Sequence, residues 1–224
     1  MKKYFRLLSL VIMFILVLSI KNNFVYAGNV QNKQIDPIPL NEINYEVNKN
    51  LYQDQIHERF EEINSSYVVN EPFSKEDSEF IRAYASLYDT KSDIPTVQNI
   101  DGSEYFNKYK ASNGLQVRFH GTLYSNTKIN SLNHSYRGNV TAYVIGTTKA
   151  QNIKLTVTNV AYGLVGGSGF GIVYNGSISD NEDDTSSYSM DRTIEYSGML
   201  VSYTYTNAYA LFKTPSGSFD LYAF

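Results

Sequence analysis

Residues 115–124, LQVRFHGTLY, alternate between apolar or small residues and polar ones. A period of two is typical of a β-strand that buries one face and exposes the other. Similar runs, rich in aromatic and β-branched residues, follow to the end of the chain between polar or glycine-rich turns. We expect strands at residues 115–124, 139–148, 152–160, 161–165, 170–177, 192–206, 208–214 and 218–224.

About eight strands without an intervening helix predict a mainly β fold, either an antiparallel barrel or a sandwich. Glycine supports a boundary before this region, because 12 of the 14 glycines follow Ala111. We assign residues 111–224 to the β domain. Its 7 acidic and 7 basic residues balance.

The preceding segment, residues 28–110, is acidic, with 15 acidic and 8 basic residues. Apolar residues recur every three or four positions from 41 to 63, which predicts a helix. Ser74, with Asp77 three residues on, predicts the start of a second helix. Two short helices bury too little surface to stand alone. We expect this lead either to cap an end or open edge of the β domain or to be a propeptide.

The first 27 residues have the pattern of a secretory signal peptide. Lys2, Lys3 and Arg6 precede an apolar run over residues 7–20, and residues 25–27, Val-Tyr-Ala, fit a cleavage site. The run is shorter than the roughly 20 residues of a membrane-spanning helix. The sequence therefore predicts an extracellular protein, and its composition is typical of a Gram-positive bacterium.

Cysteine is absent, so no disulfide supports the fold. Neither half of the exported chain has the basic surface that non-specific nucleic-acid binding requires. We therefore expect no nucleic-acid partner.

Residues 165–171, VGGSGFG, predict a tight hairpin turn, because glycine permits positive φ and close backbone approach. Residues 160–174 contain no charge. The alternatives are a buried hairpin and a hairpin that inserts into a membrane. The residues concerned are Val160, Tyr162, Leu164, Phe170, Ile172 and Tyr174.

Residues 180–184, Asp-Asn-Glu-Asp-Asp, predict an acidic loop. Asp180, Glu182, Asp184 and Asp191 fall at positions one, three, five and twelve of a calcium-binding loop. Thr185 replaces the glycine usual at position six, and position twelve is Asp rather than Glu. A solvated loop without calcium is the alternative. We expect no other cofactor.

Tyrosine points to a binding surface, since 11 tyrosines lie in the β domain. The residue combines a large rigid ring with a polar tip, which suits recognition. The residues that we expect to bind are Tyr196, Tyr203, Tyr205 and Tyr209.

No catalytic pattern emerges from the sequence. His57, His120 and His134 are isolated, and Ser168 lacks the glycine that a nucleophile elbow places two residues later. Glu182 and Glu195 are the only glutamates of the β domain, and no spacing pairs them as hydrolase carboxylates. We therefore expect a protein that is not an enzyme.

Residues 115–224 resemble the virulence-associated (Vap) proteins of actinobacterial pathogens. The similar stretches are residues 117–122 (VRFHGT), the turn GGSGFG leading into residues 172–174 (IVY), and the final hairpin around residues 215–217 (PSG). The resemblance implies a compact eight-stranded antiparallel barrel without an enzymatic site. The helical acidic lead differs from the disordered lead of those proteins.

These patterns predict a secreted protein that binds at the cell envelope or on a host or competitor cell. A glycan, an envelope polymer or a host-surface molecule is the expected partner. One alternative is a pore-forming toxin or bacteriocin with an acidic propeptide, and only this one involves a membrane. The other is a glycan-active hydrolase.

Overall fold

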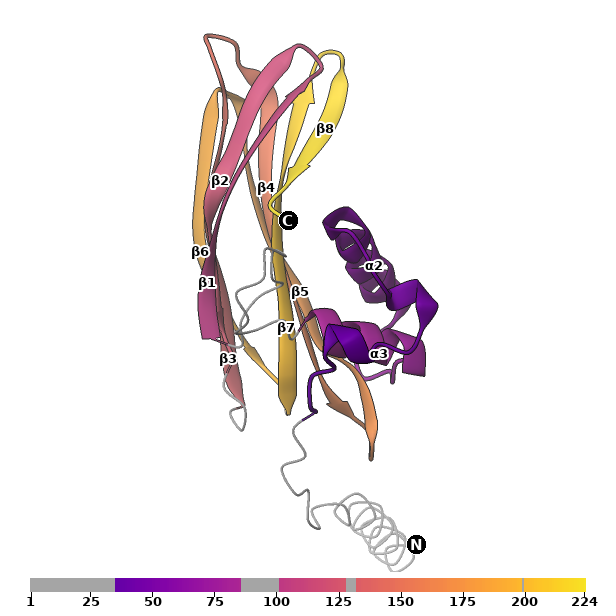
Figure 1. The fold of residues 1–224 in the computed structure, drawn as a ribbon. Helices are drawn as coiled ribbons and strands as arrows, with labels where there is room; N and C mark the ends of the chain where they lie inside the picture. The colour runs from indigo at the N-terminus through magenta and orange to yellow at the C-terminus, as the bar shows by residue number, and fades with distance from the viewer. Residues whose placement is uncertain (1–34, 86–100, 128–131, 199) are drawn as a thin grey trace, which may run out of the picture. The chain divides into compact units, whose positions relative to one another are not determined.

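The computed structural model describes residues 35–85, 101–127, 132–198 and 200–224. Within them, eight strands form two four-stranded antiparallel sheets (Figure 1). The first sheet has the order β1-β2-β3-β6 and the second β5-β4-β7-β8. The strands are β1 (Asp101–Ser112), β2 (Leu115–Asn126), β3 (Asn133–Val144), β4 (Ala150–Val165), β5 (Gly169–Thr185), β6 (Ser187–Ser197), β7 (Val201–Thr214) and β8 (Gly217–Tyr222). The predicted mainly β class is confirmed, as a sandwich rather than a closed barrel.

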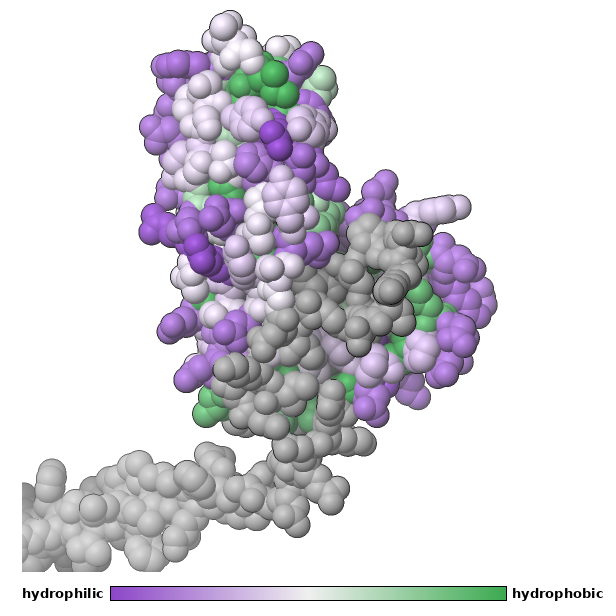
Figure 2. Space-filling view, turned by 60° about the vertical axis from the view of Figure 1, so that its left-hand side comes forward, coloured by the Kyte–Doolittle hydropathy of each residue, from purple (hydrophilic) through white to green (hydrophobic). Residues whose placement is uncertain are grey.

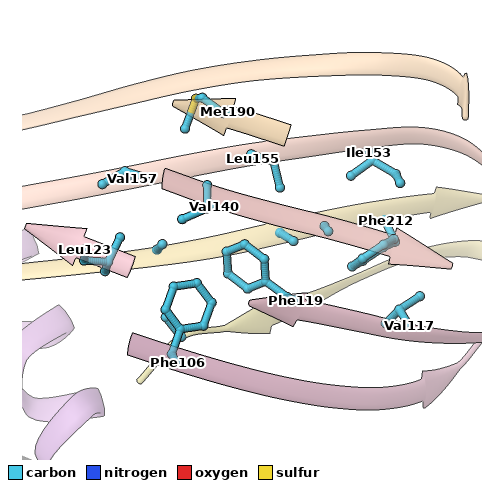
Figure 3. Packing of buried hydrophobic residues seen from close by; sticks show 14 of the residues in the cluster. Phe106, Val117, Phe119, Leu123, Val140, Ile153, Leu155, Val157, Met190 and Phe212 are labelled. Carbon is cyan, nitrogen blue, oxygen red and sulfur yellow. The ribbon is translucent and has the colours of Figure 1, made fainter. Parts of the chain in front are cut away.

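The inward faces of the two sheets meet in one hydrophobic core. Figure 3 shows Phe106 beside Phe119 from the first sheet, with their ring centroids 4.7 Å apart. Leu155 and Phe212 enter the same core from the second sheet. The alternation in residues 115–124 thus arises because odd positions of β2 are buried in this core and Arg118, His120 and their even-numbered neighbours are not.

Most of β1 lies within residues 28–110, which the sequence assigns to the lead. β1 begins at Asp101, so the predicted boundary at residue 110 falls inside a strand. Its inward positions include Glu104 and Lys108, and from Gly102 to Ser112 Phe106 is the one buried residue. An edge strand with so few apolar residues gives no alternation that sequence could detect.

Other predicted strands also had wrong limits. The strand expected over residues 192–206 is interrupted, because β6 ends at Ser197 in the first sheet and β7 starts at Val201 in the second. Leu200, between them, has a φ of 57°, a left-handed conformation incompatible with a continuous strand. Conversely, residues 152–160 and 161–165 form one strand, β4, with an irregularity at Ala161/Tyr162.

The expected acidic loop is also wrong. Residues 180–184 continue β5 and pair with β4. Two of the four carboxylates have cationic partners: Nη2 of Arg192 on β6 lies 3.2 Å from Asp180, and Nζ of Lys149, just before β4, lies 3.0 Å from Asp184. The amide of Asn152 also donates to Asp183, at 2.8 Å. Cross-strand pairing thus lets an acidic run adopt a strand.

The lead contains two 3₁₀ turns and two α-helices in its described part: η1 (Leu40–Glu42), η2 (Glu46–Asn48), α2 (Gln53–Ser66) and α3 (Lys75–Tyr84). The first helix therefore starts later than predicted. Asn50 has a φ of 53°, which prevents a helix from running through it. The start of the second is confirmed, because the Ser74 hydroxyl accepts from the Asp77 backbone N–H at 3.0 Å.

The lead covers the outer face of the second sheet and belongs to the same compact unit as the strands (Figure 1). Phe60 of α2 stacks on Tyr205 of β7 with centroids 4.3 Å apart and planes 5° from parallel. Tyr162 of β4 donates its hydroxyl to Asn64, at 2.8 Å. The predicted capping thus takes place mainly on a sheet face. The assignment of residues 28–110 as a propeptide stays a prediction.

The lead also pairs with the edge of β5. Pro72 forms an antiparallel bridge with Gly171, flanked by backbone hydrogen bonds from Asn70 to Ile172 and from Phe73 to Phe170, both 2.7 Å. A Cβ atom on Gly171 would lie 2.0 Å from the Glu71 carbonyl oxygen. The glycine therefore permits this close approach, and the lead blocks an edge that could otherwise pair with another chain.

Glu79 of α3 fixes the 3₁₀ turns to the helices. Its carboxylate is 5% exposed and accepts from the backbone N–H groups of Asn44 (2.7 Å) and Tyr45 (2.9 Å) and from the Asn48 amide (3.2 Å). Burial raises the pKa of Glu79, but these hydrogen bonds together lower it by more. The pKa therefore lies below its ordinary value.

We expect this carboxylate to make the stability of the lead depend on pH. The unfolded pKa of a glutamate is about 4.3 and the folded value is lower, so its stabilising contribution is complete above about pH 4.3 and is lost as the pH falls through the folded pKa. The Glu79→Gln variant should be less stable at neutral pH. Urea unfolding should show the difference from wild type shrinking on acidification, and a constant difference would contradict this role.

Candidate binding face

The outer face of the first sheet carries a row of three side chains. Strand register places Tyr109 of β1 opposite Arg118 of β2, and Arg118 opposite Tyr143 of β3. Because these positions alternate with the buried ones, all three side chains leave the core on the same side. The row therefore crosses three strands.

Arg118 is held in place by its neighbours in this row. Its Nε donates to the Asn107 side-chain oxygen at 2.7 Å, and its Nη1 donates to the Tyr143 hydroxyl at 2.8 Å. The guanidinium carbon lies 5.3 Å from the Tyr109 ring centroid and 5.7 Å from that of Tyr143. Two hydrogen bonds and two cation–π contacts thus order a surface arginine.

The tyrosines of β1 are open to solvent. Tyr105 is 61% exposed and Tyr109 59% exposed, so both rings offer area to a ligand. Farther along the face, Arg137 lies 5.3 Å from the ring centroid of Tyr124. Rigid rings with polar tips can contact a ligand at a small entropic cost.

Between the rings the face is polar. Its side chains are amides, hydroxyls and one imidazole: Asn107, His120, Thr122, Asn139, Thr141 and Ser189. In Figure 2 the visible surface over the strands is mainly purple to white, with small separate green patches. This face can combine ring contacts with many hydrogen bonds.

A polar hollow of about 510 Å³ lies at the end of the first sheet that carries Asn126. Its lining residues are Asn126, Asn133, His134, Ser135, Glu195, Tyr196 and Ser197. His134 and Tyr196 are buried there, and their ring centroids lie 5.2 Å apart. The hollow extends the polar character of the face.

The tyrosines that the sequence singled out lie elsewhere. Tyr203 and Tyr205 are buried under the lead, and Tyr196 is buried between the sheets, where it stacks on Tyr174 at 4.0 Å. Burial raises the pKa of Tyr196 and Tyr203 to about 12. Tyr209 is half-buried on β7. Three of the four therefore present no open ring in this structure.

Tyr205 is part of a polar contact between the lead and the sheet. Its hydroxyl lies 2.7 Å from Nδ1 of His57 on α2 and accepts from the Asn207 amide at 3.0 Å. The His57 ring also lies near Tyr222, with centroids 5.2 Å apart. The histidine that the sequence left isolated thus helps to join the lead to β7 and β8.

The uncharged hairpin is largely covered. The lead buries Val160, Tyr162, Phe170 and Ile172, while Leu164 is half-buried. Tyr174 packs against the core between the sheets. The face and edge proposed for membrane insertion are therefore occupied by residues of the same chain.

The four residues predicted to bind calcium do not gather. Asp180, Glu182 and Asp184 lie on β5, whereas Asp191 lies on β6 and contacts Arg137 through both carboxylate oxygens, at 2.6 and 2.5 Å. In the part of the chain that the structure describes, no three His, Cys, Asp or Glu side chains come together as a metal site.

No helix in the described ranges is long and apolar enough to cross a bilayer. Comparisons with known proteins found no family model and no curated protein that matches this chain. The argument for function therefore depends on the exposed face of the first sheet.

Proposed function

We propose that the protein is secreted and acts by binding, without catalysis, to a glycan at the cell envelope or on a host or competitor cell. The observation that carries the proposal is the ordered row Tyr109–Arg118–Tyr143 on the outer face of the first sheet, in which Tyr109 is exposed and the other two side chains are half-buried. Export depends on the signal-peptide pattern of residues 1–27, which lies outside the described residues.

The chemistry of this face fits a sugar better than a protein surface. Sugar rings have apolar faces, which can lie against tyrosine rings, and hydroxyl edges that need hydrogen-bond partners. Asn107, His120 and Thr141, which lie opposite one another in the next row along the strands, supply such partners. The centre of a protein interface is instead typically more apolar than the rest of the surface, and this face lacks such a centre among the described residues.

We expect single tyrosine truncations on the row to weaken glycan binding. A ring contact contributes about 0.5–1.5 kcal/mol, so Tyr109→Ala and Tyr143→Ala should each reduce affinity about tenfold or less. Residues 28–224, which contain the compact unit, would be tested against purified cell walls and soluble polysaccharides by sedimentation and calorimetry.

The matched control is Tyr52→Ala, because Tyr52 is 79% exposed but lies on the lead. This variant should bind as the wild type does. If both row variants bind the ligand as tightly as the wild type does, the binding site lies elsewhere on the protein. No binding to any wall or polysaccharide would refute the proposed function.

A second candidate function is membrane insertion of the hairpin formed by β4 and β5. It is favoured by the apolar residues that the lead covers, chiefly Val160, Phe170 and Ile172. Insertion would require the lead to leave this face. Displacement of the lead is therefore the condition on which this candidate depends.

A further inference from the structure

Arg118 differs from other arginines of the described residues in its partners. Three of them contact carboxylates: Arg59 with Asp77, Arg137 with Asp191, and Arg192 with Asp180. Arg118 contacts neutral groups instead: it donates to the Asn107 amide oxygen and the Tyr143 hydroxyl, and Tyr105 is a weaker partner. Within the described ranges no carboxylate lies at ion-pair distance from it. Its positive charge is therefore not neutralised by a neighbour.

The guanidinium group is oriented for a ligand. A guanidinium has five N–H groups, and the interactions with Asn107, Tyr143 and Tyr105 leave two of them for a ligand. The rings of Tyr109 and Tyr143 restrict its plane. Part of the ordering that a ligand would otherwise impose is thus already present, which favours binding.

The surroundings leave Arg118 as the net positive charge in this part of the face. Burial and the nearby Arg118 lower the pKa of His120, which favours the neutral form of this imidazole. Arg137, farther along the face, is neutralised by Asp191. An approaching anion would therefore meet one ordered cation framed by tyrosine rings.

We propose that Arg118 forms an anion subsite of the binding face, and that the glycan bound there carries carboxylate or phosphate groups. This inference rests on the proposed glycan-binding function. A guanidinium donates two parallel N–H bonds to a carboxylate or phosphate, which supplies both energy and geometry. The adjacent Tyr109 ring would contact the sugar that bears the charged group.

The test compares three polymers with the same backbone: neutral dextran, carboxymethyl-dextran and dextran phosphate. Residues 28–224 should bind at least one charged polymer about tenfold more tightly than neutral dextran, because charge-assisted hydrogen bonds are the stronger ones. This preference should diminish at high salt. The two charged polymers distinguish a carboxylate from a phosphate ligand.

Arg118→Gln should remove the preference, and Arg118→Lys should retain only part of it, because lysine keeps the charge but not the fork. The matched control is Arg192→Gln, which makes the same charge change at an exposed arginine that is paired with Asp180 and lies outside the binding face. The control should keep the preference. Urea unfolding would confirm that each variant is folded.

Equal binding of all three dextrans, or equal losses in Arg118→Gln and Arg192→Gln, would overturn the anion subsite while leaving glycan binding intact. Failure to bind any of the three polymers would also overturn it, and the cell-wall assay would then decide the proposed function separately. Tighter binding of single-stranded DNA than of either charged dextran would overturn the assignment of the ligand as a glycan.

Discussion

The Phe60→Ala variant should lose about 3–5 kcal/mol of unfolding free energy, the usual cost of removing a buried phenylalanine. Phe60 is fully buried between the lead and the second sheet. Its ring lies 4.9 Å from that of Phe80 and stacks on Tyr205. The substitution would leave a cavity where the two helices meet the sheet. Denaturation in guanidinium chloride would measure the effect.

Tyr52→Ala is the control for this substitution. It removes an aromatic ring at the start of α2 that is 79% exposed, and surface changes of this kind usually alter stability by about 0.5 kcal/mol or less. Hydrogen exchange should become faster along α2 in Phe60→Ala but not in the control. A loss below about 1 kcal/mol in Phe60→Ala would mean that the lead is not docked as described.

The Gly171→Ala variant should separate the lead from the edge of β5. Its new methyl group would lie 2.0 Å from the Glu71 carbonyl oxygen, and that neighbour is backbone, which cannot rotate away. Overpacking of this kind costs about 1–3 kcal/mol. The amides of Asn70 and Phe73, which donate to β5, should exchange faster.

Gly167→Ala is the matched control within the same glycine-rich turn. A Cβ atom at Gly167 would have no atom within 4 Å, so this variant should keep the stability and exchange rates of the wild type. The same pair tests membrane insertion. Vesicle leakage caused by Gly171→Ala but not by Gly167→Ala would support that candidate, whereas no leakage from either would remove its basis.

The fold class could be predicted because the strands of the core alternate clearly. In β2, Val117, Phe119 and Leu123 are fully buried, and the even-numbered residues between them are not. The same reasoning failed for β1, whose inward positions include Glu104 and Lys108. An edge strand needs few apolar residues, so its sequence carries little periodic signal.

The binding face could be predicted only in part. The polar side of residues 115–124 contains Arg118 and Tyr124, but the tyrosines beside them come from β1 and β3 and are brought together by strand register alone. Tyr203 and Tyr205 appeared to be an exposed pair because alternation cannot tell a solvent face from a face covered by another segment. The lead that covers them lies more than a hundred residues earlier in the chain.

An NMR titration of protein with ¹³C-labelled tyrosine rings tests the central claim most directly. Adding short soluble chains of a glycan that binds should shift the ring resonances of Tyr105, Tyr109 and Tyr143, because these rings lie on the proposed face. The rings of Tyr162 and Tyr205, buried beneath the lead, should not shift. Shifts confined to the buried rings, with the three face tyrosines unchanged, would contradict the account.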